Sequence, residues 1–244
     1  MYIYGTHAVE EGLTHKPHIF RKVFFAGAKE QKNFQALTSK HGIPTDHFDP
    51  RTPPKPVTEH DVHQGVIADI DETKLIQKFD PFIESLEVNA ETALVLLGEV
   101  QDPQNVGAVI RSAAAFGVAG VLIPEHNQVQ ITSSVVKVSA GMAFRIPLIS
   151  IGNVNNTLRE LKDKKFWIYG LDGEGENALP QESFDAPAVF VLGGEAAGIR
   201  EKTKEHCDFL LAIPLHPQCE SLNAATSLSV ALYEWSRQHP PRNT

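Results

Sequence analysis

The chain has 244 residues and a mass of 26.8 kDa, a length that fits one or two domains. Hydrophobic residues make up 42% of it, which excludes a disordered chain, and no apolar run approaches the roughly 18 residues of a membrane span. The first residues lack the basic and apolar regions of a secretory signal, and Cys207 and Cys219 cannot build a disulfide framework. We therefore expect a soluble, cytoplasmic protein without membrane contact.

The charge is distributed unevenly along the chain. The formal net charge of −8 argues against a small, strongly basic nucleic-acid-binding protein, although it allows local basic patches. Residues 1–65 contain eight Lys/Arg and seven Asp/Glu, whereas the remainder contains fourteen and twenty-three. Seven of the eleven histidines also fall in this first quarter, which therefore repels an anion least. Scattered surface side chains would give the same count.

Residues 1–75 are predicted to form a small αβ domain. Its expected elements are a helix capped by Thr6, a strand at 23–26, a helix at 32–41, a strand at 43–48 and a strand at 65–70. Residues 49–56 contain four prolines, which remove backbone donors and exclude regular structure. A polar linker with one or two helical turns is expected at 76–91.

The pattern changes at residue 92, where apolar strands begin to alternate with helices. Strands are expected at 93–97, 120–124, 145–149, 166–171, 188–192 and 209–213, and helices at 105–116, 153–164, 203–207 and 222–238. The first strand is continuously apolar, as in a parallel sheet covered on both faces. Residues 92–244 are therefore predicted to form an α/β domain with a mostly parallel sheet.

Two glycine-rich segments follow predicted strands. Residues 173–178 fit a relaxed GxGxxA pattern, but two glutamates and a following proline make a poor dinucleotide site, so a surface turn is the better interpretation. No P-loop pattern is present, which excludes a P-loop nucleoside triphosphatase. Residues 192–198 are better placed, because ligands bind beyond the carboxyl ends of strands in such sheets. There Glu195 suits a cationic or hydroxyl-bearing ligand, with a simple turn as the alternative.

Two further segments place polar side chains where helices start. Asn105 is expected near the start of one helix and Arg111 nearly two turns into it. The Arg111 guanidinium either extends to solvent along an apolar helix or anchors a phosphate. After residues 213–215 and a polar loop, Ser221 is expected to cap the last helix and Asn223 to lie in its first turn.

Together, the order and spacing of these segments resemble the three signature motifs of the SpoU/TrmH family. The members of this family are RNA ribose 2′-O-methyltransferases of the SPOUT superfamily. The matching segments are Asn105-Val-Gly-Ala-x-x-Arg111, Leu192-Gly-Gly-Glu195 and Ile213-Pro-Leu215 with Ser221-Leu-Asn223. Residues 4–9 and 62–68 resemble the ends of the family's ribosomal-protein-like N-terminal domain, which binds substrate. Residues 219–220 and 224–226 depart from the usual third motif.

The resemblance implies a homodimer and a catalytic α/β domain whose C-terminal part is threaded as a deep trefoil knot that holds S-adenosylmethionine. The implied cofactor-binding residues are Leu192, Gly193, Gly194, Glu195, Ile213, Leu215, Leu222 and Asn223. Arg111 is the implied catalytic residue, with Asn105, Glu195, Ser221 and Asn223 around it. No metal is implied, and no Cys/His cluster offers one.

Methyl transfer to a ribose 2′-oxygen is an in-line displacement, so the protein contributes mainly alignment. A guanidinium pKa above ~12 makes Arg111 an awkward base. We expect it to hold the 3′-phosphate and to stabilise a developing alkoxide, while direct deprotonation stays open.

The substrate is expected to be a guanosine of 23S rRNA, because the N-terminal domain is complete and no basic C-terminal extension follows Arg237. A tRNA 2′-O-methyltransferase and a non-catalytic RNA-binding protein of the same fold are the alternatives. A nucleotide-dependent dehydrogenase is a third alternative, but no GxGxxG follows residues 93–97.

Overall fold

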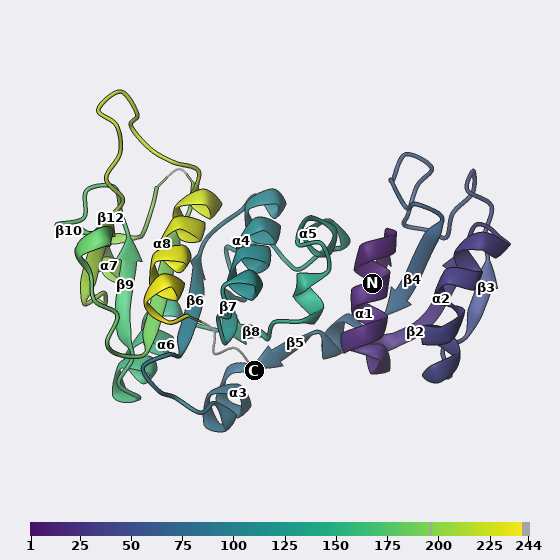
Figure 1. The fold of residues 1–244 in the computed structure, drawn as a ribbon, viewed down its shortest axis with the longest axis horizontal. Coiled ribbons are helices and arrows are strands. Elements are labelled where there is room, and N and C mark those ends of the chain that lie inside the picture. The colour runs from purple at the N-terminus through teal and green to yellow at the C-terminus, as the bar shows by residue number, and fades with distance from the viewer. Residues whose placement is uncertain (196, 241–244) are drawn as a thin grey trace. The chain divides into compact units, whose positions relative to one another are not determined.

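The computed structural model describes residues 1–195 and 197–240. They divide into two compact units, drawn in Figure 1: Met1–Ile76 with Ile131–Arg145, and Gln77–Gln130 with residues 146–240. The segment Ile131–Arg145 therefore packs with the first unit, although strands of the second unit flank it in sequence. Within the described residues, no helix is long and apolar enough to cross a membrane.

The first unit is a four-stranded sheet with the strand order β1-β4-β2-β3. Its strands are β1 (Tyr2–Tyr4), β2 (Phe20–Phe25), β3 (Thr45–His47) and β4 (Val66–Ile70); β4 is antiparallel to both neighbours, and β2 is parallel to β3. Its α-helices are α1 (Thr6–His15), α2 (Ala28–Lys40) and α5 (Ser133–Val138), and its 3₁₀ turns are η1 (Pro17–Ile19), η2 (Glu72–Lys74) and η3 (Met142–Phe144). Buried apolar side chains of α1 and the strands form the core of this unit.

Several local expectations for the first unit were wrong. Thr6 is the first residue of α1 rather than its cap, because Gly5 occupies the cap position with φ 98°. The Thr6 backbone N–H and hydroxyl both donate to Gln64 Oε1, each at 2.9 Å. The helix expected at 32–41 begins four residues earlier, and α5 was not expected. Arg145, expected to start a strand, instead forms an ion pair with Glu11 of α1.

The second unit is an eight-stranded sheet in the order β10-β12-β9-β11-β6-β7-β8-β5. The strands are β5 (Ile76–Lys78), β6 (Ala93–Gly98), β7 (Gly120–Pro124), β8 (Leu148–Ile151), β9 (Trp167–Leu171), β10 (Asn177–Ala178), β11 (Ala188–Gly193) and β12 (Phe209–Ala212). The six neighbouring pairs from β10 to β8 are all parallel. The predicted α/β class with a mostly parallel sheet is confirmed.

Helices cover both faces of this sheet. They are α3 (Phe79–Ser85), α4 (Pro103–Ala115), α6 (Val154–Asp163), α7 (Glu201–Lys204) and α8 (Ala224–Gln238), and η4 (Leu179–Gln181) is a 3₁₀ turn. One core cluster joins apolar side chains of α3 and α6 to alternate residues of the central strands. The helices α4 and α8 pack side by side, with Ser112 Oγ 2.7 Å from Ser229 Oγ (Figure 1).

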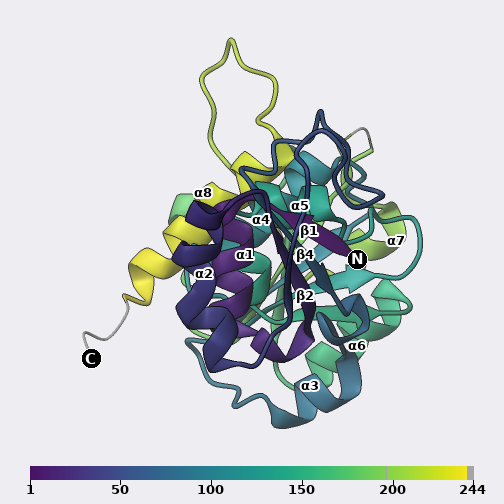
Figure 2. The same cartoon turned by 90° about the vertical axis from the view of Figure 1, so that its right-hand side faces the viewer.

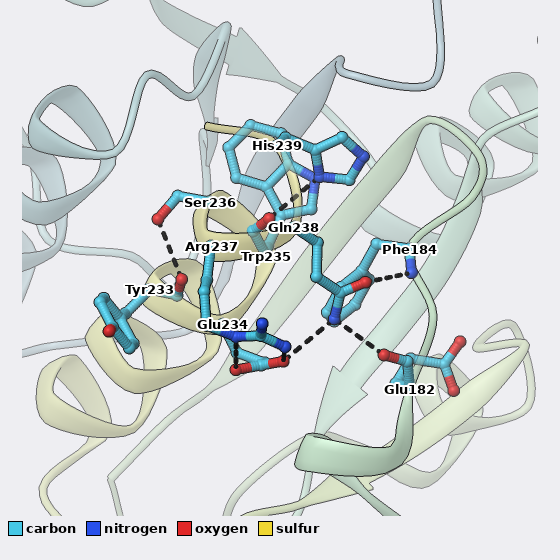
Figure 3. Close-up of polar contacts among 9 residues, drawn as sticks. All are labelled: Glu182, Phe184, Tyr233, Glu234, Trp235, Ser236, Arg237, Gln238 and His239. Atoms are coloured by element: carbon cyan, nitrogen blue, oxygen red, sulfur yellow. Dashed lines mark hydrogen bonds and ion pairs between the residues drawn. The ribbon is translucent and has the colours of Figure 1, made fainter. Parts of the chain in front are cut away.

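The end of α8 is anchored to the segment between η4 and β11 (Figure 3). The Gln238 amide donates to the Glu182 carbonyl at 2.9 Å and accepts from the Phe184 N–H at 3.1 Å. One turn earlier, the Trp235 ring stacks on His239 with centroids 5.2 Å apart. These contacts hold the end of α8 in place. The loop at 213–223 therefore runs between two fixed elements, β12 and α8.

Candidate active site

The loops at the carboxyl ends of β9, β11 and β12 enclose a cavity of about 690 Å³. These strands are parallel neighbours, so their carboxyl ends meet at one edge of the sheet. The loop from β12 to α8 projects beyond that edge in both Figure 1 and Figure 2. The cavity lining includes all eight residues predicted to bind a cofactor: Leu192, Gly193, Gly194, Glu195, Ile213, Leu215, Leu222 and Asn223. Ser221, predicted to be catalytic, also lines it.

The glycines after β11 are required by the backbone itself. Gly194 and Gly198 exchange two hydrogen bonds, N–H to carbonyl, at 3.1 and 2.9 Å, which pairs the two ends of the segment 194–198. A Cβ on Gly193 would lie 2.1 Å from the Gly198 carbonyl carbon, and Gly198 has φ +62°. The sequence suggested that these glycines let a ligand approach the backbone closely. In the structure, the absence of a side chain at Gly193 also lets the Gly198 backbone approach it.

A chain of polar side chains joins the three motif segments beside the cavity. The Asn223 amide donates to Asn105 Oδ1 at 2.8 Å, and the Asn105 amide donates to Glu195 Oε1 at 2.9 Å. The N–H groups of Gln101 and Asp102 also point at the Glu195 carboxylate, each at 3.4 Å. We refer to Asn105, Glu195 and Asn223 as the polar chain. Asn105, its central member, is only 6% exposed.

The surroundings of Glu195 keep its carboxyl ionised. Partial burial raises its pKa, but the hydrogen bonds from Asn105 and from backbone N–H groups outweigh burial and hold the pKa below its ordinary value. An ionised carboxylate only accepts hydrogen bonds. Glu195 is therefore suited to holding donors and cations and not to supplying a proton.

Asn223, and not Ser221, caps the last helix. Its side-chain oxygen accepts from the Thr226 N–H at 3.2 Å, and its backbone is still non-helical. The expectation that Ser221 is the cap and that Asn223 lies in the first turn was therefore wrong by two residues. Because one Asn223 side chain caps α8 and bonds Asn105, the start of α8 is tied to the start of α4.

The structure leaves Arg111 apart from the polar chain. Arg111 is exposed and forms no hydrogen bond or ion pair with any described residue. Arg111 comes six positions after Asn105, which places it about 9 Å along α4 and roughly 120° around the helix from Asn105. Neither Arg111 nor Asn105 lines the cavity. The guanidinium is therefore free to meet an external anion.

One ion pair near the cavity escaped the sequence analysis. Arg200 donates to Glu99 Oε2 at 2.8 Å, and a second contact to Oε1 is 2.6 Å, so the pair is bidentate. Glu99 follows β6 with φ +67°, and Arg200 follows the 194–198 loop. The pair closes that loop against the end of β6. Its partners lie 101 residues apart, so no local pattern could have linked them.

The lining of the cavity is acidic. Glu195 and Glu220 contribute carboxyl groups without an ion-pair partner among the described residues, whereas the Asp172 carboxylate is paired with Lys204 at 2.6 Å; no Lys or Arg is present among the described lining residues. Across residues 1–195 and 197–240, no three His, Cys, Asp or Glu side chains gather as they would around a metal ion. The arrangement can hold a cationic ligand against ionised carboxylates and repels a phosphate.

Two family models match the chain. The SpoU rRNA Methylase family model covers residues 92–233, and the model named RNA 2′-O ribose methyltransferase substrate binding covers residues 2–75. The first match spans more than half of the sequence. The chain belongs to the SpoU rRNA methylase family.

Similar proteins with curated names extend over nearly the whole chain. The 23S rRNA (guanosine-2′-O-)-methyltransferase RlmB of Haemophilus influenzae is 36% identical over 241 residues, 97% of each chain. The protein of the same name from Pseudomonas aeruginosa is 35% identical over 243 residues, 98% of this chain and 97% of that one.

Solved structures share the fold. A putative RNA methyltransferase of the TrmH family from Porphyromonas gingivalis has a TM-score of 0.77 and 26% identity, covering 97% of this chain and 89% of that one. The SpoU methyltransferase AviRb from Streptomyces viridochromogenes, in complex with AdoMet, has a TM-score of 0.77 and 21% identity, covering 98% and 90%.

Proposed function

We propose that this protein transfers the methyl group of S-adenosylmethionine to the ribose 2′-hydroxyl of a guanosine in 23S rRNA. The observation that carries the proposal is the acidic, glycine-framed cavity at the carboxyl edge of the sheet, with the polar chain beside it. The curated relatives are named for the same reaction, and they match the whole chain.

The cavity residues fit S-adenosylmethionine. Its adenosine suits backbone groups of the loops after β11 and β12 together with apolar side chains such as Leu192, Leu215 and Leu222. Its sulfonium is a cation, which suits a cavity that has Glu195 and Glu220 but no lining Lys or Arg among the described residues. The same charges disfavour a pyrophosphate, which counts against a nicotinamide dinucleotide. When bound, S-adenosylmethionine supplies an electrophilic methyl group.

The chain's own residues would align the acceptor ribose. The polar chain holds Asn105 with both of its amide atoms engaged, so the start of α4 has a fixed position beside the cavity. Arg111, on the same helix, would hold the 3′-phosphate and stabilise negative charge that develops on the 2′-oxygen. Ser221, exposed in the loop before α8, is proposed to contact the acceptor ribose.

The first unit is proposed to present the RNA. The substrate-binding model matches residues 2–75, and this region carries nearly balanced charge whereas the remainder is acidic. A tRNA substrate has weaker support. A solved structure whose title describes 2′-OH methylation of tRNA matches only 63% of this chain, with a TM-score of 0.57.

A homodimer is proposed from the apolar surface of α8. Tyr233 is 57% exposed and Val230 is 37% exposed, and Phe116, directly after α4, lies against the Tyr233 ring. A trefoil knot in the C-terminal part and a cytoplasmic location are proposed on the family resemblance. Analytical ultracentrifugation would test the dimer, since a Tyr233→Glu variant should shift the protein to a monomer.

The decisive experiment is a methyl-transfer assay on purified RNAs with labelled S-adenosylmethionine. Label should enter a 23S rRNA fragment at a ribose 2′-oxygen of a guanosine, and a tRNA pool should remain unlabelled. Mapping ribose methylation in 23S rRNA from a deletion strain would identify the nucleotide. Binding of S-adenosylmethionine without transfer to any RNA would favour a non-catalytic RNA-binding protein.

A further inference from the structure

A second hollow lies at the other edge of the eight-stranded sheet. It has a volume of about 440 Å³ and is lined by Lys162, Lys165, Phe166, Trp167, Asp208 and Phe209. Trp167 begins β9 and Phe209 begins β12, so this hollow lies at the amino ends of strands whose carboxyl ends frame the acidic cavity. Five residues of β9 separate the two edges by roughly 13–17 Å.

Trp167 is fixed in place but open to solvent. Its side chain is 45% exposed, although tryptophan is usually well buried. One face of its indole stacks on Phe209 at 5.1 Å and 13° between planes. Phe209 stacks in turn on Tyr169 at 5.5 Å and 19°, and Tyr169 stacks on Phe190. The supporting rings extend into the core, so the indole is a rigid aromatic surface.

Two of the three charged side chains that line this hollow are lysines, and Asp163 near its rim is exposed. Lys162 is paired with Asp208 at 2.7 Å, and Asp208 also accepts from the Ile168 N–H at 2.8 Å, so the nearby carboxylate is already engaged. Lys164 and Lys165 are exposed and form no ion pair with a described residue. Lys165 has φ +70°, a left-handed turn that ends α6 just before Trp167.

We propose that this hollow binds an unpaired base of the RNA substrate, with the base stacked on Trp167 and its flanking phosphates near Lys164 and Lys165. An exposed aromatic ring beside free lysines is the combination that binds single-stranded nucleic acid. The free lysine charge favours an anionic ligand, and a contact with a second copy of this chain is one outcome of the test below. The inference rests on the proposed function, since it takes RNA to be the substrate.

The intrinsic fluorescence of Trp167 provides a direct test. The chain has two tryptophans, and Trp235 is 3% exposed with an Nε1 that has no hydrogen-bond partner among the described residues. Trp235→Phe therefore removes an unsatisfied donor and leaves Trp167 as the reporter. Titration with an oligouridylate should quench this emission to saturation, and a matched RNA duplex should not. If Trp235→Phe fails to fold, the difference between wild type and Trp167→Phe gives the same signal.

Affinity measurements with variants complete the test. Trp167→Ala should weaken binding of the oligouridylate by about 5-fold to 100-fold, the range of one lost base–aromatic stack. Lys165→Gln should weaken it further than Lys202→Gln, which removes an exposed lysine from α7 instead. The affinity for S-adenosylmethionine should be unchanged in Trp167→Ala, because its proposed cavity is at the opposite edge.

Three results would overturn the inference. They are unquenched Trp167 emission, equal quenching by duplex RNA, and emission that changes with protein concentration alone, which would indicate a contact between copies. These results are separable from failure of the proposed function. If the Trp167→Ala variant methylates 23S rRNA with full efficiency, the proposed function stands and this RNA site is rejected. If the protein binds RNA through Trp167 but transfers no methyl group, the site stands and the proposed function is rejected.

Discussion

At their carboxyl ends, β9, β11 and β12 run into loops of glycine, proline and acidic residues, whereas at their amino ends two of the same strands begin with Trp167 and Phe209. The carboxyl edge encloses a cavity whose charged lining is negative. The amino edge presents an aromatic surface with free lysines. The proposed cofactor site and the proposed RNA site therefore lie at opposite ends of the same strands, and substitutions should affect the two edges separately.

The largest effect is expected from Gly193→Val. The new side chain would collide with the Gly198 backbone and open the 194–198 loop, so binding of S-adenosylmethionine should fall at least about 100-fold. Isothermal titration calorimetry would measure the change. Gly173→Ala is the matched control, because Gly173 also lines the cavity but its Cβ would meet nothing within 4 Å. Equal losses in the two variants would contradict the role given to the loop.

Arg111→Ala should lower kcat by ~10²–10³-fold, the usual effect of removing one donor that stabilises developing charge. The melting temperature and the affinity for S-adenosylmethionine should stay the same, because Arg111 is exposed and has no partner among the described residues. Arg111→Lys should restore little activity, since an ammonium cannot reproduce a planar fork. Full activity of the Arg111→Ala variant would show that Arg111 has no catalytic role.

Asn105→Ala should give a smaller and pH-dependent effect. Asn105 lowers the pKa of Glu195 below its unfolded value, so this contribution to stability is present above the unfolded pKa and lost as the pH falls through the folded one. At neutral pH the variant should lose about 1 kcal/mol, since Glu195 is exposed and the bond is screened. In acid the difference between the two melting temperatures should shrink to the part that the hydrogen bond from Asn223 to Asn105 contributes, because that bond does not depend on the charge of Glu195. A difference that is constant with pH would show that Glu195 does not depend on Asn105.

The smallest effect is expected from Arg200→Gln. Loss of the bidentate pair with Glu99 should loosen the 194–198 loop and raise KM for S-adenosylmethionine about two- to fivefold, with kcat nearly unchanged. Arg237→Gln is the control, because Arg237 forms a similar surface pair with Glu234 away from the cavity. A kcat loss without a KM change would assign Arg200 a different role.

The sequence predicted the second unit well because its strands are buried on both faces. Residues 93–97 and 188–192 are continuously apolar, and the observed β6 and β11 differ from these ranges by one residue at one end. The expected strand at 145–149 was wrong in its start, because Arg145 belongs to the first unit, where it pairs with Glu11, and β8 begins only at Leu148. A contact across 134 residues leaves no local signal.

The candidate site shows the same limit. Glycines after an apolar strand identified the loop at 192–198, and the cavity lies there. The polar chain depends on contacts between residues 90 and 118 positions apart, which spacing along the sequence cannot reveal. Ser221 and Asn223 are both good capping residues, and only the path of the backbone decides between them.

The segment Ile131–Arg145 makes the first unit discontinuous in sequence. Phe144 from this segment lies against Phe20, and a Cβ on Gly12 would be 2.6 Å from the Phe20 ring and 3.2 Å from Phe144. A fragment that ends at residue 75 would therefore lack part of its own hydrophobic core. A chimaera that exchanges the first unit between relatives needs two insertions, residues 1–76 and residues 131–145, and the second must be spliced between β7 and β8 of the second unit.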